Sequence, residues 1–140
     1  MSKELYCQLV DQVRAKAGIN DPELSYDQCV VAIEGINFVL LHGSVMASDS
    51  MFMYVDFGEV PADNKELVLQ RLLETNLFMY TDTPSSFTIN PESKHVILVQ
   101  HVRLSGTTFE DLADRMIQAA QFAQMWRGNH FLHEHENQQS

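Results

Sequence analysis

Positive charge and cysteine are both scarce in this sequence. Nine lysines and arginines stand against nineteen aspartates and glutamates, which gives the 140-residue chain a formal net charge of −10. Because a field of this sign repels polyanions and anionic bilayers, we expect neither nucleic acid nor a membrane surface as a partner. The two cysteines, Cys7 and Cys29, are too few for a disulfide framework, so the pattern favours a reducing cytoplasm.

Long apolar runs are also missing. No stretch approaches the roughly 20 apolar residues that a membrane helix needs. Charges interrupt the apolar residues of the first ten positions, so no signal-peptide pattern is present. Hydrophobic residues nevertheless make up 45% of the chain, as in foldable globular proteins. We expect one domain over residues 1–128 and a flexible polar tail over residues 129–140.

Hydrophobic periodicity and turn residues predict eight secondary-structure elements in the order α-β-β-β-α-β-β-α. The two hairpins make the sheet antiparallel and helices interrupt it, so the expected class is α+β, a twisted antiparallel sheet with three helices. The expected elements cover residues 2–17, 29–33, 36–41, 51–57, 63–80, 87–89, 95–102 and 107–127.

Turn and cap residues set these boundaries. Gly18 follows the first helix, where a left-handed residue is common. Glu34 and Gly35 predict a two-residue hairpin turn between the first two strands. Capping-box patterns predict the starts of the second and third helices, and they are formed by Asp63 with Glu66 and by Thr107 with Glu110.

The expected strands are apolar on both faces, although an antiparallel sheet with one wet face should alternate. In the second strand, Phe38 and Leu40 point to one face while Val39 and Leu41 point to the other. The helix over residues 63–80 adds leucines that spread beyond one narrow stripe. Two interpretations follow: a tightly filled core within one chain, or an obligate homodimer with further apolar surface for another polypeptide.

The triplet Asp56-Phe57-Gly58 has the letters of the magnesium-binding signature of protein kinases. The chain lacks the glycine-rich phosphate loop, the strand lysine and the catalytic loop that accompany that signature. We therefore interpret the triplet as the end of a strand followed by a turn glycine. No nucleophile motif is present either, and we expect a protein that is not an enzyme.

The histidines raise the alternative of a metal site. A tract in the tail contains His130, His133, Glu134 and His135. A flexible tail supplies no fixed second shell of hydrogen bonds, so a solvated tail is the preferred interpretation and we expect no metal and no cofactor. His95 and His101 lie six residues apart on one strand and share a face, with no paired carboxylate evident in the sequence.

Four segments together resemble the class I type III secretion chaperones, the CesT-like (Tir chaperone) family of small acidic proteins. They are a first helix ending in "AGI" before the strand pair "CVVAIEGINFVLLHG"; "MFMYVDFGEVP", which closes on Gly-x-x-Pro; "KELVLQRLLETNLF"; and "FEDLADRMIQAAQFAQMW". The resemblance covers about residues 3–127, and the tail has no counterpart in the family pattern.

The resemblance implies a bacterial, cytoplasmic homodimer without catalytic activity. Such a protein binds an extended N-terminal segment of one or more secreted effectors and keeps it soluble and export-competent without ATP. The secretion ATPase is a further partner that the resemblance suggests. A regulatory or adaptor protein on the same fold, binding a folded partner, is the main alternative, and a metal-dependent enzyme or sensor using the tail histidines is another.

The resemblance also nominates residues for each surface. The expected effector-binding residues are Leu5, Leu9, Val31, Ile33, Phe38, Leu40 and Phe52. The expected dimer-interface residues are Leu69, Leu72, Leu73, Asn76, Leu77, Val96 and Leu98. Because the sequence does not fix which strand faces point outward, Val39, Leu41 and Met53 remain alternatives for effector binding.

Overall fold

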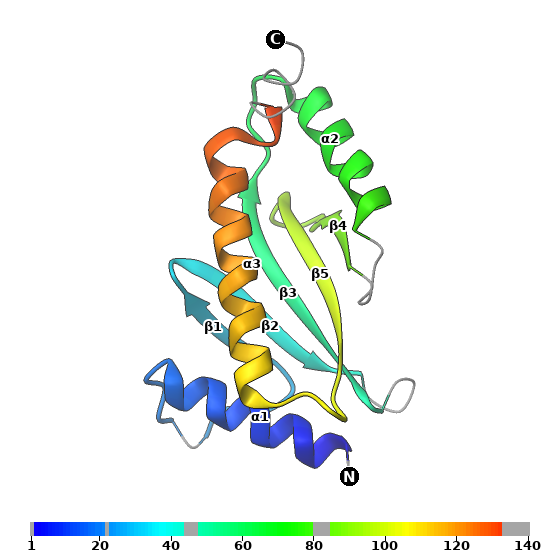
Figure 1. Ribbon diagram of the computed structural model, residues 1–140. Coiled ribbons are helices and arrows are strands. Elements are labelled where there is room, and N and C mark those ends of the chain that lie inside the picture. The colour runs from blue at the N-terminus through cyan, green and yellow to red at the C-terminus, as the bar shows by residue number, and fades with distance from the viewer. Residues whose placement is uncertain (1, 22, 44–47, 80–84, 133–140) are drawn as a thin grey trace.

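The computed structural model describes residues 2–21, 23–43, 48–79 and 85–132. The predicted order of elements is confirmed (Figure 1). The elements are α1 (Ser2–Lys16), β1 (Cys29–Ile33), β2 (Ile36–His42), β3 (Ser50–Glu59), α2 (Lys65–Phe78), β4 (Ser85–Ile89), β5 (His95–Arg103) and α3 (Phe109–Asn129).

The five strands form one antiparallel sheet in the order β1-β2-β3-β5-β4. Helix α3 runs along one face of the sheet and contacts β1, β2 and β3, while α1 crosses near its lower end and contacts β2 and α3. Helix α2 lies against β4, the strand at one edge of the sheet. Two helices therefore cover one face of the sheet, and α2 lies near one edge.

The core fills the space between the sheet and α3. Alternate strand residues point into it, among them Phe38 and Leu40 of β2 and Met53, Val55 and Phe57 of β3, all of which are fully buried. Helix α3 contributes Trp126, which is also fully buried. Because side chains alternate with a period of two, the burial of Phe38 turns Val39 and Leu41 to the opposite face.

Two predicted turns are confirmed. Glu34 and Gly35 have φ values of 51° and 80°, as a two-residue hairpin turn requires. Gly18, with φ 78°, ends α1, and the amide of Ile19 donates to the carbonyl of Arg14 at 2.8 Å. This six-residue bond is the one that characterises a glycine-terminated helix end.

Both capping predictions miss the residues that cap the helices. The box at α3 lies one residue later than predicted, between Thr108 and Asp111, because the hydroxyl of Thr107 donates to the carbonyl of Arg103. At α2 the N-cap is Asn64, which takes a left-handed conformation (φ 63°) and makes no side-chain cap bond. Asparagine tolerates the left-handed conformation better than most residues. Helix α2 therefore begins after Asn64 without the capping box predicted for Asp63 and Glu66.

The prediction that β3 ends at the Asp56-Phe57-Gly58 triplet is also wrong. The strand continues to Glu59, and Gly58 (φ 103°) lies in an irregular step of the pairing with β5. Asp56 accepts a bond from the Gly58 amide at 2.9 Å and contacts Nδ1 of His95 at 2.9 Å. His95 thus has a paired carboxylate on the neighbouring strand, which the sequence did not reveal.

Arg127 of α3 closes over this step. Its Nε donates to the carbonyl of Phe57 at 2.8 Å, and its Nη2 donates to the carbonyl of Asp56 at 3.1 Å. A Cβ atom at position 58 would lie 3.3 Å from that Nε. Glycine is therefore needed at position 58 for two reasons: it tolerates the positive φ, and its lack of a Cβ leaves room for the guanidinium of Arg127.

The end of the domain lies later than predicted. Helix α3 continues to Asn129, and Phe131 is only 8% exposed within the core cluster. Leu132 packs against the core as well, so residues 129–132, which were expected in the flexible tail, pack with the domain. The histidine tract at 133–135 lies outside the described residues. None of the described helices is long and apolar enough to cross a membrane.

Replacing Gly58 by alanine should destabilise the fold by about 1–3 kcal/mol, because the new Cβ forces strain on the backbone and crowds Arg127. Urea denaturation measures the difference. Gly128→Ala is the matched control, since Gly128 lies inside α3 with open space around it, and alanine there should be neutral or stabilising. If Gly58→Ala is as stable as the parent chain, position 58 does not require glycine.

Candidate partner-binding surfaces

The sheet face opposite the core carries apolar side chains that remain partly accessible. Tyr54 of β3 lies between Val39 of β2 and Val99 of β5 in the strand register. Next to this row, Phe52 lies opposite His101, and their ring centroids are 5.5 Å apart. In the described part of the chain these side chains are half-buried or exposed, so this face, which we call the open sheet face, can receive another polypeptide.

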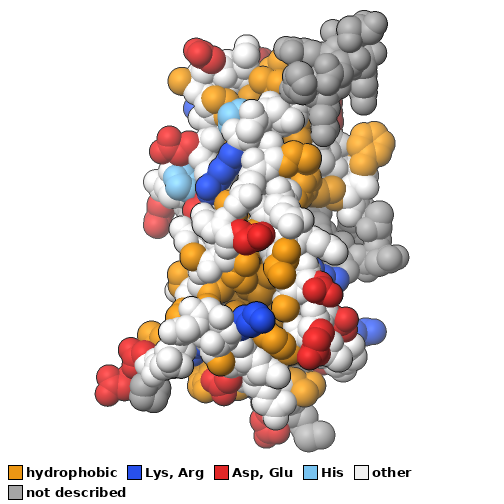
Figure 2. All heavy atoms as spheres, turned by 60° about the vertical axis from the view of Figure 1, so that its left-hand side comes forward, with side chains coloured by type: hydrophobic (Ala, Val, Ile, Leu, Met, Phe, Trp, Pro, Cys, Tyr) orange, Lys and Arg blue, Asp and Glu red, His pale blue; other side chains and the backbone are white. Residues whose placement is uncertain are grey.

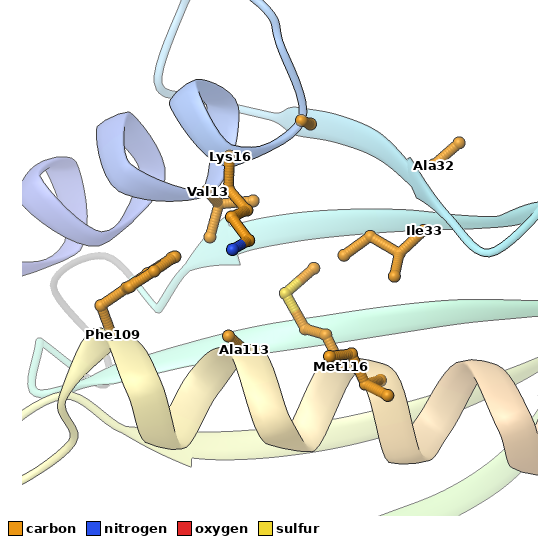
Figure 3. Close-up of a pocket in the computed structure, with 9 residues that line it drawn as sticks. Val13, Lys16, Ala32, Ile33, Phe109, Ala113 and Met116 are labelled. Carbon is orange, nitrogen blue, oxygen red and sulfur yellow. The ribbon is translucent and has the colours of Figure 1, made fainter.

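A second apolar surface is a groove between α1, β1 and α3, with a volume of about 230 Å³. Figure 3 shows Phe109 and Met116 of α3, Ile33 of β1 and Val13 of α1 around one shared space, with the Lys16 side chain lying beside it. Figure 2 shows hydrophobic side chains gathered on this side of the molecule, with lysine or arginine and carboxylate groups around them. The remaining groove residues are Ala17, Ala32, Ala113 and Ile117.

The groove lies beside an unpaired sheet edge. Strand β1 is at one end of the sheet, and Ile33 and Ile36 flank the two-residue turn as a hydrogen-bonded pair. By alternation, the N–H and C=O groups of Val30 and Ala32 point away from β2. No backbone hydrogen bond joins those two residues to any other segment among the described residues. An extended peptide could pair with them and place a side chain in the groove.

The opposite edge is different because a side chain occupies it. Asn76 of α2 accepts a bond from the amide of Phe87 at 2.7 Å and approaches the carbonyl of the same residue at 3.4 Å. The side-chain amide therefore takes the place of a neighbouring strand along part of β4. This contact keeps β4 from pairing at Phe87 and ties α2 to the sheet.

Helix α2 presents a third apolar surface. Leu73, Leu77 and Phe78 are 69%, 75% and 76% exposed, which is high for large apolar side chains. Leu72 and Val68 on the same helix are buried against the protein's own core. We call the exposed group Leu73, Leu77 and Phe78 the α2 ridge. Three such side chains within two turns of a helix are typical of an interface.

The structure separates the residues nominated for effector binding. Leu5 is exposed on α1, Ile33 lines the groove and Phe52 lies on the open sheet face. The expectation that Phe38 is accessible is wrong, because it is fully buried. Three further nominees are buried in the same core and face no partner in this conformation: Leu9, Val31 and Leu40. Of the alternatives, Val39 and Leu41 lie on the open sheet face, whereas Met53 is buried.

The residues nominated for the dimer interface are divided in the same way. Leu73 and Leu77 are exposed, and Leu69 and Asn76 are partly buried. The other three, Leu72, Val96 and Leu98, belong to the protein's own core, so they cannot contact a second chain directly without rearrangement.

Sequence reasoning missed Phe78, Tyr54 and Val99, together with the groove residues of α3. A usable indication was present for the strands. Asn37 shares a face with Val39 and Leu41, and Asp56 shares a face with Phe52 and Tyr54. A polar residue of the same parity marks the side of the strand that meets water. The groove had no comparable indication, because it combines three elements that are distant in sequence.

Two buried titratable groups among the described residues, Tyr6 and Cys29, belong to the core. The hydroxyl of Tyr6 donates to the carbonyls of Tyr26 (2.7 Å) and Leu40 (3.1 Å), and burial raises its pKa far above the ordinary value. Burial also raises the pKa of the Cys29 thiol, which keeps it protonated and unreactive. Among the described residues, no group of three or more His, Cys, Asp or Glu side chains could hold a metal ion.

Known structures share this fold. A chain in the crystal structure of the ExsC–ExsE complex matches 90% of this chain and 92% of its own length, with a TM-score of 0.70 and 13% identity. A chain in the HopA1–SchA chaperone–effector complex matches 89% of this chain and 94% of its own, with a TM-score of 0.64 and 13% identity. No curated protein matches the sequence.

The sequence itself matches a family model over most of its length. The model describes the Tir chaperone protein (CesT) family, and it aligns with residues 8–126. That range runs from the middle of α1 almost to the end of α3, so it contains the whole sheet, the groove and the α2 ridge. The chain therefore belongs to the Tir chaperone protein (CesT) family.

Proposed function

We propose that this protein is a type III secretion chaperone that binds an extended N-terminal segment of an effector and keeps it export-competent without ATP. Family membership supports the general role, and one structural neighbour is named as a chaperone–effector complex. The observation that carries the proposal furthest is the unpaired β1 edge beside an apolar groove. An unfolded segment can use such an edge, whereas a folded partner seldom offers a free strand.

In this proposal the segment adds to the sheet beside Val30 and Ala32. Backbone hydrogen bonds supply affinity that does not depend on the effector's sequence. One apolar side chain enters the groove, where Ile117 (41% exposed) lies at an accessible position. The net charge of −10 favours segments with basic residues and keeps the complex soluble.

We further propose that two copies of the chain associate through the α2 ridge. The exposed leucines and Phe78 contact little of their own protomer, and burying one such side chain contributes about 1.5–3 kcal/mol. Because α2 packs on β4, the second copy would lie next to that edge of the sheet. The groove, which lies beside β1 at the opposite edge, would remain accessible in such a dimer.

Replacing Leu77 by glutamate should convert the dimer to a monomer at micromolar concentration. A charge in the centre of an apolar contact costs about 2 kcal/mol or more, which raises the dissociation constant roughly thirtyfold. Light scattering coupled to size exclusion measures the mass. The folded monomer should survive, because Leu77 is 75% exposed. A dimer of unchanged strength would show that the ridge is not the contact.

Replacing Ile117 by glutamate should weaken effector binding at least tenfold and leave the dimer intact. The charged side chain would enter the groove, where no cation but Lys16 lies among the lining residues. A pull-down from the secreting bacterium, followed by limited proteolysis and mass spectrometry, identifies what is bound. Recovery of a protected N-terminal fragment supports the proposal.

The two variants control for each other. Leu77→Glu should lose the dimer and keep the groove, whereas Ile117→Glu should keep the dimer and lose the fragment. If the parent chain instead protects a compact folded domain of its partner, the adaptor function is correct and the chaperone function is wrong.

A further inference from the structure

The chain beyond α3 folds back into the core in an unusual way. His130 and Phe131 both have left-handed backbones, with φ values of 52° and 62°. Left-handed conformations are unfavourable for residues with a Cβ, most of all for a bulky one such as phenylalanine, and two in succession are rare. Phe131 is nevertheless only 8% exposed. The surrounding contacts must therefore hold this segment in place.

Those contacts are aromatic. The ring of Phe131 lies 5.6 Å from that of Phe122 on α3 and 6.1 Å from that of Phe87 on β4, measured between centroids. The imidazole of His130 meets the indole of Trp126 edge-on at 4.6 Å. The side chain of Asn129 also accepts a bond from the amide of Phe131 at 2.8 Å. Burial lowers the pKa of His130, which favours the neutral ring against Trp126.

Phe87 is the residue through which this segment reaches α2. On its ring side, Phe87 meets Phe57 at 5.0 Å and Phe131 at 6.1 Å. On its backbone side, the Asn76 amide of α2 holds both its N–H and its carbonyl. Helix α2 packs chiefly on β4. The position of α2 therefore depends on Phe87, and Phe131 is one of the few side chains that fix the ring.

We propose that residues 129–132 form a latch that clamps β4 and α2 to the end of α3, and that the latch opens when Phe131 leaves the aromatic cluster. With the latch closed, the α2 ridge is presented in a fixed position. With the latch open, Phe87 loses a packing partner and the β4–α2 unit moves more freely. The backbone strain at His130 and Phe131 favours opening, and the aromatic contacts of Phe131 and His130 oppose it.

The latch lies beyond the part of the chain that matches the family model. The family model ends at residue 126, before Asn129, His130 and Phe131. Its effect on association rests on the proposed dimer contact at the α2 ridge, whereas the latch itself rests on the contacts of Phe131 alone.

Hydrogen–deuterium exchange of the full chain, resolved by segment, tests the latch. Phe131→Ala should speed exchange at least about tenfold in β4 and α2 and leave β1, β2 and β3 unchanged, because core Phe→Ala truncations commonly shift an equilibrium by more than that factor. Phe131→Leu keeps an apolar side chain and should give a smaller increase in the same two elements. Met125→Ala, at an exposed position on α3, is the control and should change neither.

Two truncations give an independent comparison. A chain that ends at Leu132 should exchange like the parent, whereas a chain that ends at Gly128 should behave like Phe131→Ala. Trp126 is the sole tryptophan of the sequence and is fully buried beside His130. Its quenching by acrylamide should increase severalfold in the shorter chain and stay low in the longer one.

Unchanged exchange in β4 and α2 for both Phe131→Ala and the chain ending at Gly128 would overturn the latch. An equal increase in β1–β3 would overturn it too, because Phe131 would then be an ordinary core residue. The quenching of Trp126 does not rest on a contact at the α2 ridge, because Trp126 lies on α3 beside His130. A failure of Leu77→Glu to dissociate the dimer would therefore count against the proposed interface and not against the latch.

Discussion

The packing of α3 against one face of the sheet is the interaction on which the rest of this molecule depends. Phe57 lies at its centre, with Phe87, Phe122 and Trp126 around it at centroid distances of 5.0, 5.5 and 5.9 Å. Arg127 fixes the same region from outside by binding two carbonyls of β3. Since α1 packs beside α3, both long helices are committed to this face. The other face is left with the apolar residues that a period of two places there.

This arrangement explains why the composition indicated too much apolar surface for one small chain. Inner positions of the strands fill the core, and several outer positions of β2, β3 and β5 are apolar as well. Apolar surfaces of this kind are usually covered by a partner chain, because water solvates apolar side chains poorly. The groove and the α2 ridge are also separate in space, because the groove lies beside β1 and α2 packs on β4 at the opposite edge of the sheet.

The order of elements and the hairpin at Glu34–Gly35 followed from local patterns, since each depends on neighbours along the chain. Features that depend on contacts between distant residues could not be predicted from these local patterns. Both faces of β2 are apolar, so its sequence does not show which face packs on the core. Phe38 was therefore wrongly expected on the surface. The bond between His95 and Asp56 joins residues 39 positions apart and requires the strand register. The cap of α3 lies one residue later than predicted, at Thr108, because the hydroxyl of Thr107 is turned toward the carbonyl of Arg103.

The amide of Asn76 has a consequence for how many chains this sheet can join. A sheet with two open edges can grow at both, and repeated growth produces fibres. Here one edge is occupied by a side chain at Phe87, and the other is open at Val30 and Ala32. In the proposed function, such a sheet would accept an added strand at β1, whereas Asn76 hinders the same pairing at Phe87. Under the proposed function, the protein would hold an extended segment at one edge of the sheet, while Asn76 works against further growth at the other edge.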